Sequence, residues 1–510
     1  MNEQRQFRAI KGVRDILPPD SSLWNWFEST SRRVMESYGY REIRLPIFEE
    51  TDLFASSVGL ATDIVSKEMY TFEDRPAELP DPLGHIRLPD YVEELERALE
   101  SGGIPDLPSN RQAIERLKQH TVQVFGKVTA TLPEVRDPQV FRDVFYAFNL
   151  VRTIVLGERI SLRPEATASV IRAYIEHGMH VNPGLTKLYY IGPMFRRERP
   201  QKGRYRQFYQ VGAEVLGQSD APAIDAELIE MLVVLLGECK IEKWTLLVNS
   251  IGCRDCRPKY IEALKNALAG VKEKMCGDCQ RRAETNPLRV LDCKVPQDQP
   301  LIEKLPSIAD HLCEACRSHF AELQRQLKLR EIPFTITPRL VRGLDYYMRT
   351  TFEITSPVLG AQNALVGGGR YDGLAELLGG QPTKGIGFAL GTDRFIDAIR
   401  EAGTVDASLR VDVFIAWLGG PAAAQVYPVA VRIARRLRAA GLCVELPPEE
   451  MKLKKSLGLA DKLGARYALL IGENEMAAGK YVLKRLADAQ QRELSEGELV
   501  EYLLAESRKE

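Results

Sequence analysis

The segment Met194–Gly217, with the sequence MFRRERPQKGRYRQFYQVGAEVLG, gives the strongest indication of the fold. Polar and apolar side chains alternate on both sides of a basic loop, and this alternation predicts a β-hairpin whose first strand begins near Lys187. Alternate side chains of a strand lie on one face. One face of the second strand therefore carries Phe208, Gln210, Gly212 and Glu214, and Arg196 and Glu198 share a face at the end of the first.

This row of the second strand combines an aromatic ring, an amide, a bare backbone position and a carboxylate. Such a mixture does not resemble a packed core face, and it fits the floor of a site for a flat, polar ligand. Gly212 leaves room above the backbone, and Phe208 offers a ring for stacking. A solvent-facing strand explains the same residues equally well when the strand is taken alone.

The composition predicts a globular protein of several domains. The chain has 510 residues, too many for one core, with 45% hydrophobic and 27% charged residues. No apolar run is long enough to span a membrane, and the charged start MNEQRQFRAIKGVRD has no signal-peptide core. These features predict a cytoplasmic protein without a membrane partner.

The net charge is -1, from 69 Lys+Arg and 70 Asp+Glu. A protein that coats nucleic acid nonspecifically usually carries a large basic excess. Any contact with nucleic acid must therefore come from a local patch. One basic patch, with Glu198 as its single acid, contains Arg196, Arg197, Arg199, Lys202, Arg204 and Arg206.

Three further segments carry residues suited to binding anions or polar groups. In SLRPEATA, Glu165 precedes a helix, where capping of that helix is the simpler interpretation. In VRGLDYYMRTTFEI, Arg342 offers a planar guanidinium for a carboxylate or phosphate, although a lone arginine is usually a surface residue. In GIGFALGTDRF, Arg394 lies in the first turn of a predicted helix, where anions are favoured.

The rest of the chain separates into segments of different character. Residues 20–39 have helical spacing, and residues 76–158 form a block that predicts three amphipathic helices. Residues 254–330 are charged, helical and rich in cysteine, and residues 331–395 return to glycine-rich strands. Residues 411–510 alternate strands and helices, which predicts a small α/β domain with a largely parallel sheet.

Taken in order, these segments resemble the histidyl-tRNA synthetases. YREIRLPIFEETDLF is similar to the first motif of class II synthetases, with Pro46 at the dimer interface; Met194–Gly217 is similar to the second motif and GIGFALGTDRF to the third. LRPEATA and VRGLDYYMRTTFEI resemble the histidine-specific signatures of the family. The match runs over most of the chain, with residues 76–158 as the exception.

The resemblance implies an α+β fold: a class II antiparallel-sheet catalytic domain with helical insertions, followed by a C-terminal α/β anticodon-binding domain. The expected boundaries are 1–75 and 159–253 for the first parts of the catalytic domain, 76–158 for a helical insertion of unknown role, 254–330 for a Cys-rich helical insertion, 331–403 for the last part of the catalytic domain, and 411–510 for the anticodon-binding domain.

The resemblance also implies a reaction. A histidine--tRNA ligase activates L-histidine with ATP and Mg²⁺ and transfers it to the 3′ end of tRNA(His), and the family predicts a homodimer. The implied catalytic residues are Arg342 and Arg196, which would bind the substrate carboxylate and the α-phosphate. The implied ATP-binding residues are Arg196, Glu198, Phe208 and Arg394.

Two further groups of residues follow from the same resemblance. Glu165, Thr167 and Gln210 would bind the α-amino group of histidine, whereas Glu214 and Tyr347 would recognise its imidazole, with Tyr346 adjacent. The implied contacts with the acceptor end of the tRNA are Arg199, Gln201 and Arg204. Ala166 stands where the family often has glycine, and a positive φ there would strain the backbone.

Seven of the nine cysteines lie between Cys253 and Cys316. Cys253, Cys256, Cys276 and Cys279 form two CxxC pairs with nineteen residues between them, a spacing that suits a structural zinc ion. Cys313 and Cys316 form a third pair, and Cys293 lies between. The reaction of the family does not require zinc, so a set of buried thiols is the favoured interpretation and structural zinc the alternative.

Two other classes of protein fit parts of the sequence. A synthetase-like regulatory subunit that senses histidine would tend to lack the last hundred residues and the catalytic arginines, all of which are present here. An RNA-binding module without catalysis fits poorly with the near-zero net charge and the complete set of ATP-site residues. The enzyme is therefore the preferred prediction.

Overall fold

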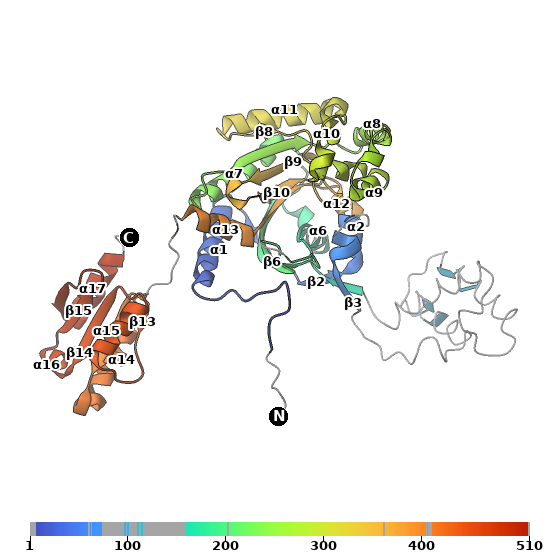
Figure 1. The fold of residues 1–510 in the computed structure, drawn as a ribbon. Coiled ribbons are helices and arrows are strands. Elements are labelled where there is room, and N and C mark those ends of the chain that lie inside the picture. The colour runs from blue at the N-terminus through green and yellow to red at the C-terminus, as the bar shows by residue number, and fades with distance from the viewer. Residues whose placement is uncertain are drawn as a thin grey trace. The chain divides into compact units, whose positions relative to one another are not determined.

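The computed structural model describes residues 7–59, 62, 64–73, 96–97, 99–100, 110–111, 114–115, 159–200, 203–360, 363–403, 405 and 411–507. Most of the block 76–158 lies outside the described residues, so its three helices stay a prediction. Apart from the first 23 residues, the chain forms two compact units, Trp24–Val405 and Asp406–Glu510 (Figure 1).

The first unit is built on an eight-stranded sheet. Its strand order is β1-β5-β6-β11-β10-β9-β7-β8, and only the outermost pairs, β1–β5 and β7–β8, are parallel. The strands are β1 (Arg41–Glu42), β5 (Thr186–Phe195), β6 (Gln207–Gly217), β7 (Thr245–Ser250), β8 (Thr335–Ile336), β9 (Met348–Thr355), β10 (Ala364–Arg370) and β11 (Lys384–Gly391).

The predicted hairpin is confirmed as β5 and β6. Its register pairs Met194 with Phe208 and Tyr190 with Gly212. On its other edge, β6 pairs with β11, which brings the GIGFALG segment beside the row of polar residues. The sheet therefore joins the second and third motifs, which are separated by more than 160 residues in the chain, as neighbouring strands.

Helices enclose the sheet. The predicted N-terminal helix is confirmed as α1 (Asp20–Ser37), and its Phe27 packs on Phe395 of α13 (Thr392–Ala402) with ring centroids 4.9 Å apart. The apolar helix α7 (Pro222–Glu238) is largely buried. A second layer contains α2 (Thr51–Val58), the π-helix Ile64–Glu68, α6 (Thr167–Glu176), α12 (Leu374–Leu377) and a small antiparallel sheet of β2 (Phe48–Glu50), β4 (Arg159–Leu162) and β3 (Tyr70–Glu73).

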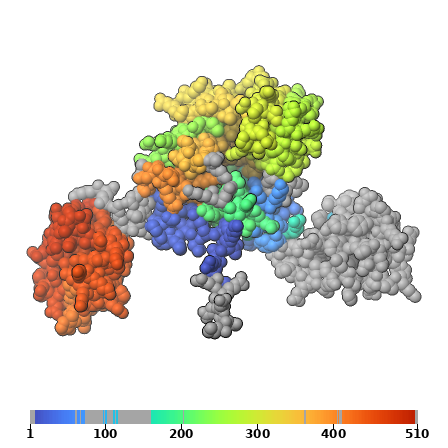
Figure 2. All heavy atoms as spheres, viewed as in Figure 1, coloured from blue at the N-terminus to red at the C-terminus, as the bar shows by residue number. Residues whose placement is uncertain are grey.

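The Cys-rich segment is helical, as predicted. It contains α8 (Arg257–Ala269), α9 (Gly277–Thr285), the short α10 (Gln299–Ile302) and α11 (Glu314–Leu329), joined by 3₁₀ turns. Its core is small and includes Cys256, Cys279, Cys293 and Cys316 beside Tyr260. The yellow-green atoms of this segment gather on one side of the first unit (Figure 2).

The second unit is an α/β domain, but its sheet is less parallel than predicted. In the order β13-β12-β14-β15-β16, only β13–β12 and β12–β14 are parallel, because a C-terminal hairpin extends the sheet in antiparallel fashion. The strands are β12 (Val413–Leu418), β13 (Val444–Glu445), β14 (Tyr467–Gly472), β15 (Tyr481–Arg485) and β16 (Gln491–Leu494). The helices are α14 (Ala423–Ala439), α15 (Leu453–Lys462), α16 (Glu473–Ala478) and α17 (Glu496–Ser507).

The predicted end of α14 is confirmed, because Gly441 follows it with a φ of 88°. Among the helices of the described residues, none combines the length and the apolar character that crossing a bilayer requires.

Candidate active site

A cavity of about 300 Å³ lies in the first unit, over β6, β10 and β11. Most of the residues that the sequence singled out line it, although they come from four separate segments. The predicted residues in its wall are Glu165, Thr167, Arg196, Glu198, Arg204, Phe208, Gln210, Arg342, Tyr346, Tyr347 and Arg394. Of the remaining predicted residues, Arg199 is exposed and is not part of the wall, and Gln201 lies outside the described residues.

Arg342 is held by a carboxylate and a glycine. Its Nη1 donates a 2.6 Å hydrogen bond to Oε2 of Glu353 on β9. Its guanidinium lies directly over Gly367 of β10, where a Cβ would overlap it. The run of glycines that opens GGGRYDG could serve either a plain turn or a close approach of the backbone to another group; these glycines lie in strand β10, and Gly367 leaves room for this cation.

Arg196 lies at the end of β5 beside the aromatic ring of Phe208, with its guanidinium carbon 5.1 Å from the ring centroid. Its Nε donates to the carbonyl of Pro164 at 2.9 Å, which fixes the side chain. Glu198 is close to two arginines, since its carboxylate lies 3.8 Å from Arg196 and 3.2 Å from Arg204. Arg196 and Glu198 do lie beside one another, but β5 ends at Phe195, so both residues follow the strand and do not share a strand face.

Arg394 lies in the first turn of α13 and also lines the cavity. Its guanidinium donates to the carbonyls of Gly203 at 3.4 Å and Ala364 at 3.3 Å. The neighbouring Asp393 accepts from Arg14 at 2.7 Å and from the backbone N–H of Tyr209 at 3.3 Å. Four guanidinium groups therefore face one cavity, which makes it a site for anions.

Glu165 caps α6 and also lines the cavity. Its carboxylate accepts hydrogen bonds from the N–H groups of Thr167 at 2.7 Å and Ala168 at 3.0 Å. The capping interpretation is thus confirmed, and it does not exclude a ligand. Burial raises the pKa of Glu165, and the two backbone hydrogen bonds oppose that rise. Ala166 has a φ of -111°, so the alanine causes no strain.

Glu214 lies behind the cavity wall, which differs from its expected place on the floor. Only 1% of it is exposed, and its two oxygens accept from the hydroxyls of Thr167 at 2.8 Å and Tyr371 at 2.6 Å. Burial is the largest influence on the pKa of Glu214, which is raised to about 8. Gly212 does leave room, but the ring of Tyr190 fills it.

Tyr371 is a site residue that the sequence reasoning missed. It lies in GGGRYDG, separated from the run of glycines by Arg370. Its hydroxyl donates to Glu214, and its ring packs edge-on against Tyr346 with centroids 5.8 Å apart. A tyrosine two positions after the last glycine of a glycine-rich strand was the available indication.

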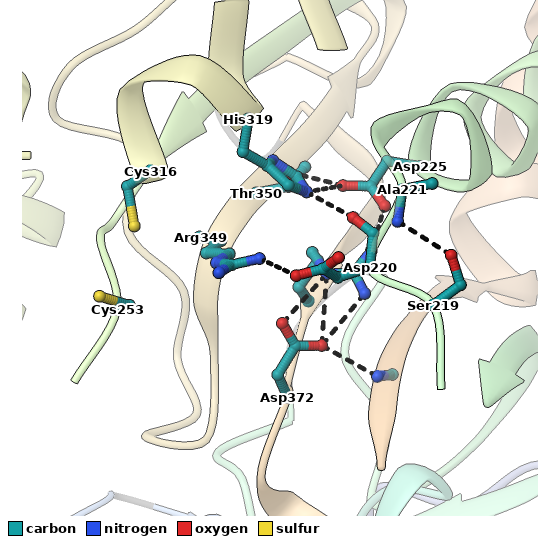
Figure 3. Close-up of polar contacts among 12 residues, drawn as sticks. Ser219, Asp220, Ala221, Asp225, Cys253, Cys316, His319, Arg349, Thr350 and Asp372 are labelled. Carbon is teal, nitrogen blue, oxygen red and sulfur yellow. Dashed lines mark hydrogen bonds and ion pairs between the residues drawn. The ribbon is translucent and has the colours of Figure 1, made fainter. Parts of the chain in front are cut away.

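A buried ion-pair network holds Tyr371 in place. The preceding Arg370, 1% exposed, pairs with Asp225 and, at 3.1 Å, with Asp372. Thr350 donates to Asp225 at 2.7 Å, and His319 of α11 hydrogen-bonds the carbonyl of Asp220 at 3.0 Å (Figure 3). The network therefore ties α7, α11, β9 and β10 together immediately beside the site.

Several polar atoms of the cavity wall have no protein partner among the described residues. They are buried and comprise the hydroxyl of Tyr190, Oε1 of Gln210 and Nε of Arg342. Buried polar groups are normally hydrogen-bonded. A polar ligand in this cavity would supply these partners.

The hydroxyl of Tyr347 is protonated at neutral pH. Burial raises the pKa of Tyr347 to about 12, so its hydroxyl stays a donor at neutral pH.

The cysteines do not form the single group that their spacing suggested. Cys253 and Cys256 cluster with Cys313 and Cys316, whereas Cys276 and Cys279 cluster with Cys293 and Asp298. The two CxxC pairs, which the sequence grouped into one zinc site, therefore belong to two different clusters. The reason is that α8 carries the chain away between the two CxxC pairs.

Comparisons with known proteins agree with this site. The family model "Histidyl-tRNA synthetase" matches residues 106–395, and the model "Anticodon binding domain" matches residues 412–506. The chain is 47% identical over 500 residues to a histidine--tRNA ligase of Koribacter versatilis, covering 97% of this chain and 96% of the relative. It is 46% identical to that of Solibacter usitatus, covering 98% and 99%.

Solved structures agree as well. The apo histidyl-tRNA synthetase of S. aureus is 31% identical with a TM-score of 0.69, and the match covers 98% of this chain and 100% of that one. The enzyme of Nostoc sp. PCC 7120 shares the fold at 18% identity and a TM-score of 0.62, with 98% and 100% covered. From its sequence, its fold and its site, the chain belongs to the histidyl-tRNA synthetase family.

Proposed function

We propose that the chain is a histidine--tRNA ligase, which joins L-histidine to ATP as histidyl-adenylate with release of pyrophosphate, and then transfers histidine to the 3′ end of tRNA(His). One observation carries this proposal. Arg196, Arg342 and Arg394 line the same cavity as Glu165 and Gln210, so cations for phosphates and acceptors for an ammonium group face one space.

Two of these cations would act at the reacting atoms. Attack of the histidine carboxylate on the α-phosphate brings two anions together, and Arg196 and Arg342 would offset their repulsion as charge shifts. Both guanidinium groups are fixed by protein acceptors, Pro164 and Glu353, so little reorganisation is needed. No side-chain nucleophile is required, because the substrate carboxylate attacks.

The nucleotide would lie on β6 and β11. Phe208 would stack on adenine, Glu198 would help to hold the nucleotide, and Arg394 would bind the outer phosphates. Carboxylate oxygen is the donor that Mg²⁺ prefers, and Glu198 in the cavity wall fits that requirement. When bound with ATP, Mg²⁺ would neutralise phosphate charge.

Histidine would lie at the end of the cavity near α6. The α-ammonium group of histidine would donate hydrogen bonds to Glu165, Thr167 and Gln210. Tyr346 would lie beside the bound histidine. The imidazole would be read by Glu214 and Tyr347. Because Glu214 already binds the hydroxyls of Thr167 and Tyr371, the imidazole N–H would have to displace one of these donors or be bound through it.

The tRNA would contact two parts of the chain. The exposed Arg199, together with Gln201 and Arg204, would contact the acceptor end, and the second unit would bind the anticodon. We also propose a homodimer that uses the segment around Pro46, and a cytoplasmic location because the substrate would be a tRNA.

Histidine-dependent exchange between ATP and pyrophosphate tests this proposal. The folded protein should catalyse the exchange with histidine and with no other amino acid. Arg342→Ala should abolish the exchange while leaving the circular dichroism spectrum unchanged. Arg325→Ala, on the exposed surface of α11, is a matched control that should keep full activity. Folded wild-type protein without exchange would reject the proposal.

A further inference from the structure

We propose that residues 253–316 bind two structural zinc ions. The four-cysteine site consists of Cys253, Cys256, Cys313 and Cys316, and the three-cysteine site consists of Cys276, Cys279, Cys293 and Asp298. In each site the four ligand atoms lie within 4.8 Å of one another. Neither site belongs to the cavity described above, and none of these residues lines it.

The four-cysteine site has the dimensions of a tetrahedral zinc–thiolate centre. Its sulfur–sulfur distances are 3.6 Å for Cys253–Cys256, 3.8 Å for Cys253–Cys313 and 3.8 Å for Cys256–Cys316. Zinc–sulfur bonds of about 2.3 Å in a tetrahedron place the sulfurs about 3.8 Å apart. Cys253 lies after β7 and Cys316 in the first turn of α11, and the sulfur of Cys316 is directed toward Cys253 (Figure 3).

The three-cysteine site combines sulfur with one oxygen. The sulfurs of Cys276 and Cys293 are 3.9 Å apart, and Oδ2 of Asp298 lies 3.2 Å from the Cys293 sulfur. Asp298 is fully buried and faces this cluster. Its carboxylate also accepts from the backbone N–H of Cys276 at 3.0 Å, which orients it toward the thiols. A buried carboxylate among thiols needs a cation or a proton, and zinc would supply the cation.

Backbone N–H groups are directed at the sulfurs of both clusters, as they are at metal-bound sulfurs. The N–H of Cys253 points at the Cys256 sulfur at 3.1 Å, and that of Val295 points at the Cys293 sulfur at 3.4 Å. Such donors favour the thiolate, which is the form that binds a metal. Gly252, with a φ of 70°, lets the chain turn so closely that a Cβ would lie 2.7 Å from the Cys256 sulfur.

Disulfide bonds do not explain the clusters. A sulfur–sulfur bond is about 2.05 Å long, whereas the sulfur–sulfur distances given above are 3.6 Å or more, and all nine cysteines are free thiols. Four protein ligands at each site leave no position open for a substrate, which is typical of structural zinc. Zinc therefore fits both donor sets.

The two sites are nested along the chain. The four-cysteine site joins positions sixty residues apart and so closes the segment, while the three-cysteine site lies inside that loop. The segment between them consists of short helices and 3₁₀ turns around a small core. A small core often needs a metal for stability, because the binding free energy becomes folding free energy.

Metal analysis of the purified full-length protein tests the proposal. We expect about two zinc ions per chain. A double substitution in either cluster should lower the zinc content to about one ion per chain. The two double variants are Cys253→Ser/Cys313→Ser for the four-cysteine site and Cys276→Ser/Cys293→Ser for the three-cysteine site. Cys239→Ser/Cys443→Ser, which changes the two cysteines outside the clusters, should keep about two. These ratios identify each site separately, since each pair of substitutions removes ligands from one cluster only.

A second measurement keeps the test independent of variants that fail to fold. Metal-free wild-type chain titrated with Co²⁺ should develop thiolate-to-cobalt charge-transfer bands and tetrahedral d–d bands that saturate near two equivalents. Folded protein that contains no zinc and gives no such bands would overturn the proposal. Iron in place of zinc would overturn the identity of the metal.

Discussion

The guanidinium of Arg342 lies directly over Gly367, a strand residue without a side chain to exclude it. Gly367→Ala should therefore displace Arg342 and leave the sheet intact, because the overlapping atoms are the far end of a flexible side chain. We expect kcat for ATP–pyrophosphate exchange to fall about 100-fold. Gly237→Ala, on α7 where an added Cβ meets nothing, is the control and should leave kcat unchanged. Equal kcat values for the two variants would contradict the assigned role of Arg342.

Glu214 should make the free energy of unfolding decrease as the pH rises. Its pKa in the folded protein is about 8, above the ordinary value of 4.5, so the folded state favours the protonated form. The stability that this proton contributes is complete below about pH 4.5 and is lost as pH rises toward 8. Glu214→Gln removes this dependence. The melting temperature of the wild type relative to Glu214→Gln should therefore fall between pH 5 and pH 8.5.

The same Glu214→Gln variant also tests recognition of histidine. Loss of the Glu214 carboxyl group should raise KM for histidine by about 10- to 100-fold with a smaller effect on KM for ATP, since a site built around a buried acceptor discriminates strongly. An equal rise in both KM values would refute the selective role of Glu214 in binding histidine.

The stability prediction has its own contradicting outcome. If the melting temperatures of the wild type and of Glu214→Gln changed in parallel between pH 5 and pH 8.5, the raised pKa of Glu214 would be refuted.

Removal of Arg370 should destabilise the first unit strongly. Arg370→Met leaves Asp225 and Asp372 buried without their cation, and breaking a buried pair costs about 3–5 kcal/mol. Activity should fall as well, because Tyr371 loses its support beside Glu214. Urea denaturation followed by fluorescence would measure the loss. Arg325→Ala, which removes an exposed pair on α11, should cost less than about 1 kcal/mol, and similar losses for both variants would argue against the network.

The four-cysteine site should affect histidine binding more than the three-cysteine site. Arg257, which begins α8 beside Cys256, donates to the carbonyl of Tyr347, and the backbones of Ile251 and Arg349 pair at 2.8 Å next to it. Cys253→Ser/Cys313→Ser should therefore raise KM for histidine about 10-fold by misplacing Tyr347. Cys276→Ser/Cys293→Ser is the matched control and should change KM much less. The reverse order of effects would show that this coupling is absent.

Local patterns allowed much of the fold to be predicted. The β5–β6 hairpin follows from alternation across a short loop, and α1 and α14 follow from helical spacing, because neighbouring residues settle these elements. The antiparallel end of the C-terminal sheet was not predicted. Its two strands are short, and their pairing with β14 depends on contacts that spacing does not reveal.

The candidate site was predicted in its composition and only partly in its geometry. Arg196, Arg342 and Arg394 do line one cavity. The depth of Glu214 was not predictable, because it depends on Thr167 and Tyr371, which come from other segments and cover it. Tyr371 itself was missed for the same reason.

Local patterns in the sequence specify which elements form and which side chains are available, since strand alternation, helix spacing and residue chemistry act over a few positions. Tertiary structure decided which of those side chains meet. Cys253 pairs with Cys313 across sixty residues, and not with the nearer Cys276, because β7 and α11 bring the first two together while α8 carries the third away. Contacts of this kind depend on how the whole chain packs, and no local pattern encodes them.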